Sequence, residues 1–336
     1  MQGIAVALYY SGLLRLRFFI RRAIFRKKEI CILALHRVLP EEQRLHTSSL
    51  EGMILKEATF AKMLEFLDQR FRVVSLEDFL STTESRKSDR RPWCLITFDD
   101  GWKDNFTTAY PLLQRFNFPA TIFLVTSMIG REDGFWVERL RKAWAVPTQR
   151  RHMDAVIAEI LPSQGEESDI GLENVVEYAK QMSADKRGRL LERLLPSNPP
   201  QEPTHDLDRL MTWEEVMEMD RTGVEMGAHT VTHPILIHED NETIRHEVRL
   251  SKKNLEEKLA RTVRAFAYPN GDWNETVRAE VERAGFRCAF TTKRRWYCSG
   301  GDLFTIPRII IHEKKLTGFR GEFSPAVFSL TLSRWR

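Results

Sequence analysis

The chain has 336 residues, of which 42% are hydrophobic and 29% are charged. This composition is ordinary for a soluble globular protein of one or two domains. The net charge is +4, but residues 1–28 contain seven basic residues and no acidic one, which leaves 44 basic and 47 acidic residues elsewhere. The body of the protein therefore carries a net charge of −3, which argues against a nucleic-acid-binding surface.

The N-terminal residues 13–28 predict an amphipathic helix lying in a membrane interface. Five apolar residues fall on one arc of a helical wheel, with basic residues on both flanks: Leu13, Leu16, Ile20, Ala23 and Ile24 against Arg15, Arg17, Arg21, Arg22, Arg26 and Lys28. The run 4–14 lacks the layout of a secretory signal and is interrupted too early to span a bilayer. We expect the basic side chains to reach anionic headgroups, which would hold the protein peripherally on the cytoplasmic face of the inner membrane. The alternative is a helix packed on the folded body.

The elements expected next alternate between strand and helix. Hydrophobic periodicity predicts a strand over 30–38, a helix over 60–71, strands at 73–74 and 94–98, a helix over 105–116 and a strand over 121–125. Such alternation predicts an α/β fold with a mainly parallel sheet or barrel. Four cysteines without a C-x-x-C pair, two of them in strand-like runs, favour free thiols and a reducing compartment.

Between residues 131 and 210 the alternation stops. Helices are expected over 137–144 and 175–195 with polar segments around them, and we interpret this stretch as a helical insertion without a catalytic motif. Alternation then resumes with helices over 213–220, 242–259 and 276–284 and strands over 224–228, 265–268, 289–291 and 306–311. The chain thus divides into an N-terminal segment (1–29), a main domain (30–320) and a C-terminal tail (321–336).

The first chemical motif is the run TFDDGW at residues 97–102. Neighbouring strand residues point to opposite faces, so Asp99 and Asp100 can serve one site only where the strand has ended, and the following Gly101 indicates that it has. At a strand end one carboxylate can bind a metal ion while the other handles a proton.

The second motif places His229 and His233 four residues apart. Such a pair falls on the same side of a helical turn and can bind one metal ion. One aspartate and two histidines leave coordination positions open for water. Zinc suits these ligands, and nickel, cobalt or manganese would also be accepted.

Together these motifs resemble the polysaccharide deacetylase family, also called the NodB-homology family or carbohydrate esterase family 4. The family's T-F-D-D-G and H-[S/T]-x-x-H motifs are both complete here, about 130 residues apart and in the family's order, while residues 266–271 (FAYPNG) are similar to its F-R-P-P-Y-G. The resemblance implies a distorted (β/α) barrel and metal-dependent removal of N-acetyl groups from aminosugars. It also implies that Asp99 is the general base and that Asp100, His229 and His233 bind the metal.

The chain departs from the family pattern in two ways. Ala267 stands where the family has the arginine that holds the base, and Arg264, three residues earlier, is a candidate replacement. The fourth and fifth motifs are missing from their usual C-terminal places. Residues 31–36 resemble the fifth motif, and some branches of the family carry that strand first, as a circular permutation. His36 would then be the general acid, with His312 as the second candidate.

The third motif also suggests groups that contact the substrate. The backbone N–H of Asn270 or of a neighbour such as Tyr268 would stabilise the oxyanion, and Trp273 is the best candidate for stacking on a sugar ring. These features predict a carbohydrate deacetylase acting on an N-acetylated glycan or a lipid-linked oligosaccharide, as in exopolysaccharide biosynthesis. Alternatives are a deformylase or O-acetyl esterase on the same scaffold, and a catalytically inactive glycan-binding protein.

Overall fold

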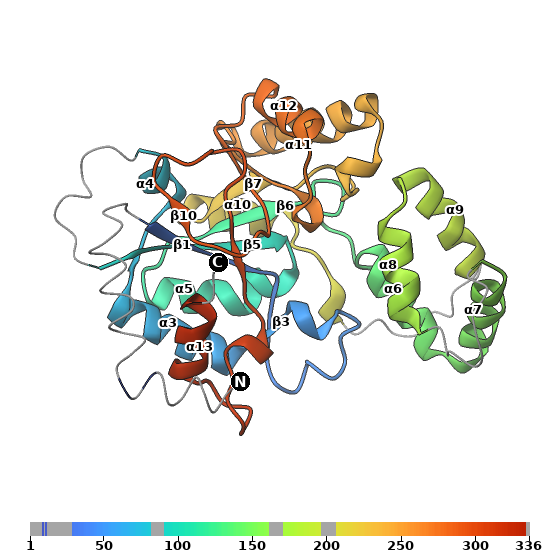
Figure 1. Ribbon diagram of the computed structural model, residues 1–336, viewed down its shortest axis with the longest axis horizontal. Helices are drawn as coiled ribbons and strands as arrows, with labels where there is room; N and C mark the ends of the chain where they lie inside the picture. Colours follow the sequence, from blue (N-terminus) through green and yellow to red (C-terminus); the bar gives the residue numbers. More distant parts are fainter. Residues whose placement is uncertain are drawn as a thin grey trace.

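A computed structural model describes residues 9, 11, 29–81, 91–160, 171–195 and 206–333. Figure 1 shows a curled sheet surrounded by helices, with a second group of helices beside it. The expected interfacial helix over 13–28 lies outside the described residues, so it stays a prediction. Within the described part of the chain, no helix has both the length and the apolarity needed to cross a membrane.

The main sheet is built from parallel strands. Its order is β1 (Glu29–Leu35), β5 (Trp93–Asp100), β6 (Thr121–Leu124), β7 (Glu225–Ala228), β8 (Ala265–Ala267) and β9 (Cys288–Phe290). Three short strands join it: β4 (Arg72–Val73) beside β5, and antiparallel β10 (Tyr297–Cys298) and parallel β11 (Ile309–Ile310) on β1. A separate parallel pair consists of β2 (Arg37–Leu39) and β3 (Ile54–Lys56).

One stretch of chain connects the two ends of the curled sheet. Ile306 forms a parallel bridge with Phe290 of β9, and the chain then continues into β11 on β1, where Ile311 N donates to Ala34 O at 2.8 Å. The expected α/β fold with a distorted barrel is therefore confirmed. Because the strands are parallel, their carboxyl ends, which carry the motifs, open at one mouth.

Successive side chains of a strand point to opposite faces of the sheet, which produces one hydrophobic layer inside the barrel and another outside it. On β1 and β5, Ile32 and Leu95 pack inside with Phe290, whereas Leu33 and Ile96 pack outside against helices. The helices are α3 (Glu57–Arg70), α4 (Leu76–Leu80), α5 (Tyr110–Arg115), α10 (Trp213–Arg221), α11 (Asn241–Leu259), α12 (Glu275–Arg283) and α13 (Pro325–Ser333). Helix α13 occupies most of residues 321–336, which were expected to form a C-terminal tail.

The short helical turns are Glu51–Met53, Asp206–Asp208, Leu236–His238, Pro269–Gly271 and Glu313–Lys315, and the π-helical turn Asn105–Ala109 leads into α5. Two helices begin with capping boxes: Ser75 with Asp78 begins α4, and Thr212 with Glu215 begins α10. The helix expected over 105–116 is thus α5 preceded by a π-helical turn.

The described parts of the insertion contain four helices: α6 (Trp136–Ala145), α7 (Pro147–Ile160), α8 (Leu172–Lys180) and α9 (Ala184–Leu194). The single helix expected over 175–195 is two helices, because the chain turns after Lys180 and Ser183 caps α9. These helices share a hydrophobic cluster of their own, which includes Leu140, Met153 and Val176. The insertion is therefore a small helical unit at the side of the barrel (Figure 1).

Candidate active site

The two aspartates of the first motif end strand β5. Asp100 has a φ of +77°, which breaks the extended alternation that would send its side chain to the opposite face from Asp99. Gly101 follows with a φ of +84°, and a Cβ there would lie only 2.7 Å from Leu124 Cδ2. Both carboxylates can therefore serve one site, as expected from the glycine.

The histidine pair lies on an irregular loop, which corrects the expectation of a helical turn. Strand β7 ends at Ala228, and Thr230 and His233 have φ values of +71° and +62°. His233 N donates to Thr230 Oγ1 at 3.0 Å. Glu247 of α11 accepts from the backbone N–H of Val231 at 2.7 Å and of Thr232 at 2.9 Å. Left-handed residues in such positions are strained and are typical of functional sites.

Asp100, His229 and His233 come together at the barrel mouth. The two Nε2 atoms are 3.2 Å apart, and Asp100 Oδ1 lies 3.7 Å from His229 Nε2 and 3.5 Å from His233 Nε2. Tetrahedral ligands about 2.1 Å from a zinc ion would be separated by about 3.4 Å. The donor set therefore fits a zinc-like ion both in chemistry and in spacing.

The surroundings of this cluster favour metal binding over a charged imidazole. Burial is the main cause that lowers the pKa of His233 to about 3, and the neighbouring His229 adds to it against the attraction of Asp100. A neutral imidazole is the form that binds metal. His229 Nδ1 lies 2.7 Å from the carbonyl oxygen of Ala267, a contact that would fix the ring with Nε2 free to bind.

Arg308 holds the side chain of Asp99. Its Nη1 donates to Asp99 Oδ1 at 2.7 Å and its Nη2 to Oδ2 at 2.8 Å, and the arginine is fully buried. Nη1 also reaches Thr97 Oγ1 at 3.1 Å, and Nε donates to Thr291 O at 3.1 Å. Burial is the largest single influence and would raise the pKa of Asp99, but the charge and hydrogen bonds of Arg308, together with the nearby imidazoles of His229 and His36, lower that pKa to about 2. Asp99 is therefore ionised across the physiological range.

Arg308 holds Asp99 as the missing family arginine was expected to do. The sequence analysis did not identify Arg308 for this role. The candidate named from the sequence, Arg264, pairs instead with Glu225 at 3.0 Å and Glu77 at 3.7 Å. It precedes β8, so it lies at the opposite end of the strands from Asp99. The signal that could have identified Arg308 is a charged residue inside the apolar run of the closing strand.

His36 and His312 follow adjacent parallel strands. The register pairs Leu35 with Phe98 and Ala34 with Ile310, so His36 comes level with both Asp99 and His312 at the mouth. The Nδ1 atom of each histidine is buried and, within the described part of the chain, has no hydrogen-bond partner. Burial and the charges of Lys315 and Lys314 lower the pKa of His312 to about 4. His312 therefore lies at the mouth beside His36. The role of His36 as the acid stays a prediction.

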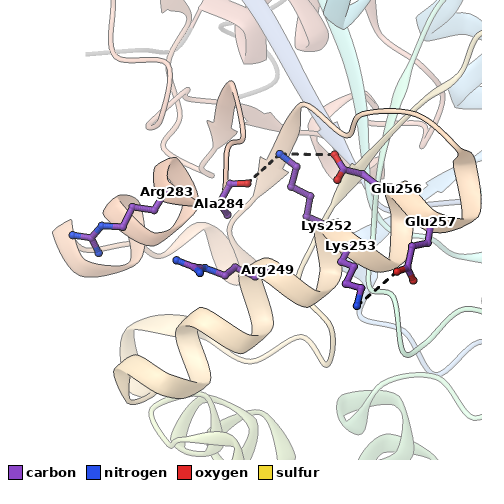
Figure 2. A pocket seen from close by; sticks show the side chains of 7 residues that line it. All are labelled: Arg249, Lys252, Lys253, Glu256, Glu257, Arg283 and Ala284. Atoms are coloured by element: carbon purple, nitrogen blue, oxygen red, sulfur yellow. Dashed lines mark hydrogen bonds and ion pairs between the residues drawn. The ribbon is translucent and has the colours of Figure 1, made fainter.

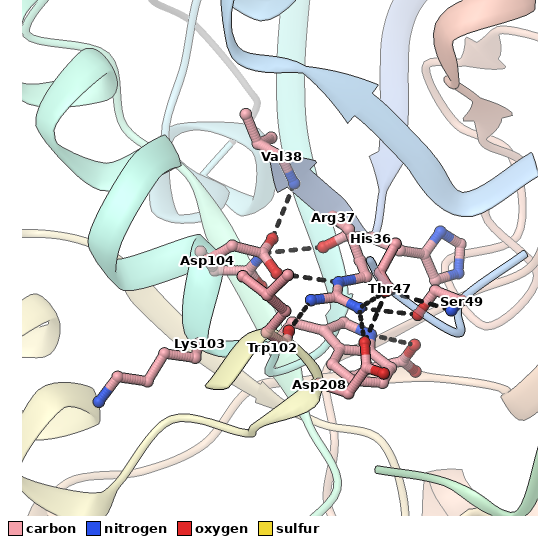
Figure 3. Close-up of polar contacts among 12 residues, drawn as sticks. His36, Arg37, Val38, Thr47, Ser49, Trp102, Lys103, Asp104 and Asp208 are labelled. Atoms are coloured by element: carbon pink, nitrogen blue, oxygen red, sulfur yellow. Dashed lines mark hydrogen bonds and ion pairs between the residues drawn. The ribbon is translucent and has the colours of Figure 1, made fainter. Parts of the chain in front are cut away.

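Trp102 connects the metal-ligand candidate Asp100 to a buried polar network (Figure 3). Its Nε1 donates to Asp100 Oδ2 at 3.0 Å, and the guanidinium of Arg37 lies 4.3 Å from its ring centre. Arg37 is fully buried between Asp104 at 2.9 Å and Asp208 at 2.6 Å. It also donates to Leu207 O, Thr47 Oγ1 and Ser49 Oγ.

The same network holds the backbone around His36. Asp104 Oδ1 accepts from Val38 N at 2.7 Å, and Asn105 Nδ2 donates to His36 O at 2.7 Å. One set of contacts therefore fixes both the His36 segment and the Asp100 side chain.

The helical insertion contributes to the site, which the sequence did not suggest. The Phe135 ring lies 5.2 Å from the His233 ring. Glu138 is buried and accepts from Ser49 Oγ at 3.2 Å. Burial raises the pKa of Glu138 to about 7, and the negative charge of Asp100 adds to this shift. The start of α6 thus forms one wall of the candidate site.

The third motif agrees only partly with expectation. Tyr268 is fully buried in the outer hydrophobic layer, its hydroxyl donates to Phe304 O at 2.9 Å and its backbone N–H donates to Phe290 O at 3.0 Å, so neither group is available to a substrate. The reason is its register on the outer face of the strand end. Asn270 is exposed, with a φ of +59° and its amide bound to Asp272. Trp273 is 36% exposed, and its contact with sugar stays a prediction.

A surface hollow of about 630 Å³ lies on the outside of α11 and α12 and includes none of these residues (Figure 2). Its lysines pair with its own glutamates, Lys252 with Glu256 at 3.9 Å and Lys253 with Glu257 at 3.7 Å. Its arginines, Arg249 and Arg283, both approach Glu280. The positive and negative charges of this surface therefore balance each other, and the hollow is not the candidate active site.

Comparison with known proteins agrees with the geometry. A family model described as polysaccharide deacetylase matches residues 86–289, more than half of the chain. The chain is 21% identical over 264 residues to the poly-beta-1,6-N-acetyl-D-glucosamine N-deacetylase of Staphylococcus aureus, a match that covers 75% of this chain and 64% of that protein. The chain thus spans slightly less than two thirds of that relative.

Solved structures share the fold. IcaB from Ammonifex degensii superposes with a TM-score of 0.57 at 18% identity, covering 86% of this chain and 94% of that one. The Streptococcus pyogenes deacetylase PplD, solved in complex with acetate, gives 0.56 at 18% identity and covers 86% and 95%. The matched family model, together with the two complete motifs and their convergence at one mouth, shows that this chain belongs to the polysaccharide deacetylase family.

Proposed function

We propose that this chain is a metal-dependent hydrolase that removes N-acetyl groups from aminosugars of a glycan or lipid-linked saccharide. The observation that carries the proposal is that two sets of residues meet at one barrel mouth. Asp100, His229 and His233 form a metal-like donor set, and the adjacent Asp99 is held ionised by Arg308. A divalent ion bound there, with zinc best suited to these ligands, would polarise the acetyl carbonyl and favour ionisation of water.

The residues of the chain supply the proton transfers. Asp99 accepts a proton from the water whose oxygen forms the new bond to the acetyl carbon. The C–N bond of the amide then breaks, and His36 donates a proton to the departing amine, so the products are acetate and a free amino sugar. The backbone N–H of Asn270 would stabilise the oxyanion.

The pairing of Asp99 with Arg308 favours an active enzyme over an inactive glycan-binding protein. Loss of the family arginine at Ala267 would leave a buried base without an orienting partner, but Arg308 provides two hydrogen bonds to it from another strand. A bidentate guanidinium fixes both the position and the ionisation of a carboxylate. A protein that only bound glycans would have no use for such a carboxylate.

An acyl-donor comparison tests this function. Purified metal-loaded protein would be incubated with an N-acetylated glucosamine oligosaccharide, its N-formyl counterpart and an O-acetylated glycan. We expect acetate release from the N-acetyl substrate to exceed the release of acid from the others at least tenfold. Preferential formate release or ester cleavage would assign the scaffold to one of the alternative reactions.

The substrate and the place of action follow from two further proposals. The S. aureus relative is named for acting on poly-beta-1,6-N-acetyl-D-glucosamine, and we propose a related N-acetylated glycan here. We also propose that residues 1–28, with seven basic residues and no acidic one, attach the protein to an anionic membrane surface. Binding of the full chain to anionic vesicles should weaken as salt rises and disappear when residues 1–28 are deleted. Salt-independent binding would contradict this attachment.

A further inference from the structure

Arg187, in the first half of α9, is a buried cation. Only 5% of its surface is exposed, and no hydrogen bond or ion pair to its guanidinium exists among the described residues. Its Cζ atom lies 5.3 Å from the centre of the Trp136 ring. Burying an unpaired charge lowers stability, so a guanidinium kept in such a place is better explained by ligand recognition than by packing.

Arg187 differs in this respect from the two other buried arginines of the described chain. Arg308 is held by Asp99, and Arg37 lies between Asp104 and Asp208. Glu239 is the carboxylate whose charge is felt by Arg187, but that carboxylate accepts from the backbone N–H of Ala184 at 2.7 Å. The guanidinium of Arg187 therefore keeps its donors free for another group.

Two contacts connect the helix of Arg187 to the loop and the side chains around the metal-ligand candidates. First, the Ala184–Glu239 hydrogen bond docks the start of α9 on the loop that follows His233, and Arg187, three residues after Ala184, lies on the same helix face. Second, Trp136 under its guanidinium directly follows Phe135, whose ring contacts the His233 ring.

We propose that Arg187, with Trp136 beside it, binds an anionic group that the substrate carries next to the acetamido sugar. The group would be a phosphate or a carboxylate, because a guanidinium presents paired donors that match both. The indole ring offers a face for an adjoining sugar. This inference rests on the proposed deacetylase function, and it makes the helical insertion the element that selects the substrate.

The test compares three substrates that share one N-acetylglucosamine unit. The neighbouring sugar would be neutral, would carry a phosphate, or would be a uronic acid. The variants are Arg187→Gln, Arg187→Lys and the matched control Arg189→Gln, which removes the same charge from an α9 side chain that is 66% exposed and paired with Asp185. A thermal unfolding transition of each variant verifies that it is folded.

We expect wild-type kcat/KM to be at least tenfold higher for one anionic substrate than for the neutral one. Losing one charge-assisted hydrogen bond should abolish most of that preference in Arg187→Gln, chiefly through KM, while Arg187→Lys keeps part of it. Arg189→Gln should retain the wild-type ratio. The preferred anion identifies the kind of substrate. A preference for phosphate indicates a phosphorylated or lipid-linked saccharide, and a preference for carboxylate indicates a glycan that contains uronic acid.

Equal kcat/KM for all three substrates in the wild type, or an undiminished preference in Arg187→Gln, would overturn the inference. If none of the substrates releases acetate, the proposed function fails, and calorimetric binding of the same three oligosaccharides decides the role of Arg187. Tighter anion binding that Arg187→Gln loses supports that role, and equal binding by both proteins refutes it.

Discussion

The guanidinium of Arg308 binds both carboxylate oxygens of Asp99, although the two residues lie 209 positions apart in the chain. Arg308 belongs to the stretch that connects β9 with β1, so the segment that closes the barrel also holds the candidate base. An orienting arginine is thus retained in this chain, at a different position on the same barrel.

Replacing Arg308 with methionine should raise the pKa of Asp99, because the buried carboxylate would lose the charge that keeps it ionised. We expect the acid limb of the kcat/KM profile to move upward by at least about one pH unit. Breaking a buried pair should also lower the free energy of unfolding by about 3–5 kcal/mol. A pH–rate profile and denaturant unfolding measure the two effects.

The direction of the pH effect on stability follows from the low pKa of Asp99, about 2 in the folded protein. A depressed carboxyl pKa stabilises the fold above the unfolded value near 4, and this contribution is lost as pH falls from about 4 to 2. Arg264→Met is the control, since it breaks an ion pair with Glu225 at the other end of the strands. Arg264→Met should lower stability without moving the acid limb of the kcat/KM profile. If that limb also stays in place in Arg308→Met, Arg308 does not set the pKa of Asp99.

Replacing Trp102 with phenylalanine tests the link between the buried network and Asp100. A smaller aromatic ring would still face Arg37 and Phe135, but the hydrogen bond to Asp100 Oδ2 would be lost. Partners of this kind typically contribute 10–100-fold to metal affinity. We expect zinc titration calorimetry to show a loss of about that size.

The control for this variant is Trp213→Phe, on the partly buried surface of α10, which makes no described contact with the metal-ligand candidates. Its zinc affinity should equal that of the wild type. Equal affinities in Trp102→Phe and the wild type would mean that Asp100 does not depend on the indole N–H.

The sequence predicts the barrel and the metal-like cluster well, because both depend on local patterns. The apolar runs that end at Asp100 and Ala228 identify β5 and β7, and parallel strands bring their carboxyl ends to one mouth. Two complete motifs then identify the residues there. The geometry of the histidine loop was not predictable, because positive φ values at Thr230 and His233 follow from tertiary contacts such as those of Glu247.

The sequence did not predict the residues whose roles depend on contacts between distant parts of the chain. Arg308 meets Asp99 only when the barrel closes, so its charge inside an apolar run marks it as unusual but does not identify its partner. Phe135, Glu138 and Arg187 lie in an insertion without a motif, and their relation to His233 or Asp100 depends on how that insertion docks. Tyr268 was misassigned for a similar reason, since its burial is set by the register of a short strand.

Substituting the two mouth histidines separately tests which of them is the general acid. His36→Asn should lower kcat by about 10² or more, because amine departure would lose its proton donor. His312→Asn should cost less than tenfold, since burial and nearby lysines keep the pKa of His312 near 4 and its ring neutral at working pH. Steady-state rates with one N-acetylated substrate decide the matter, and the reverse ranking would transfer the role to His312.

The measurement that tests the account most directly is bound metal and acetate release determined together for Asp99→Asn and His233→Ala. We expect Asp99→Asn to keep stoichiometric metal while turnover falls by about 10² or more, because only proton abstraction is removed. His233→Ala should lose both metal and turnover, whereas the exposed His238→Ala should lose neither. Chelation of the wild type should abolish acetate release, and the added ion should restore it. Wild-type turnover by Asp99→Asn, or by protein that holds no metal, would contradict the proposed metal-dependent deacetylase.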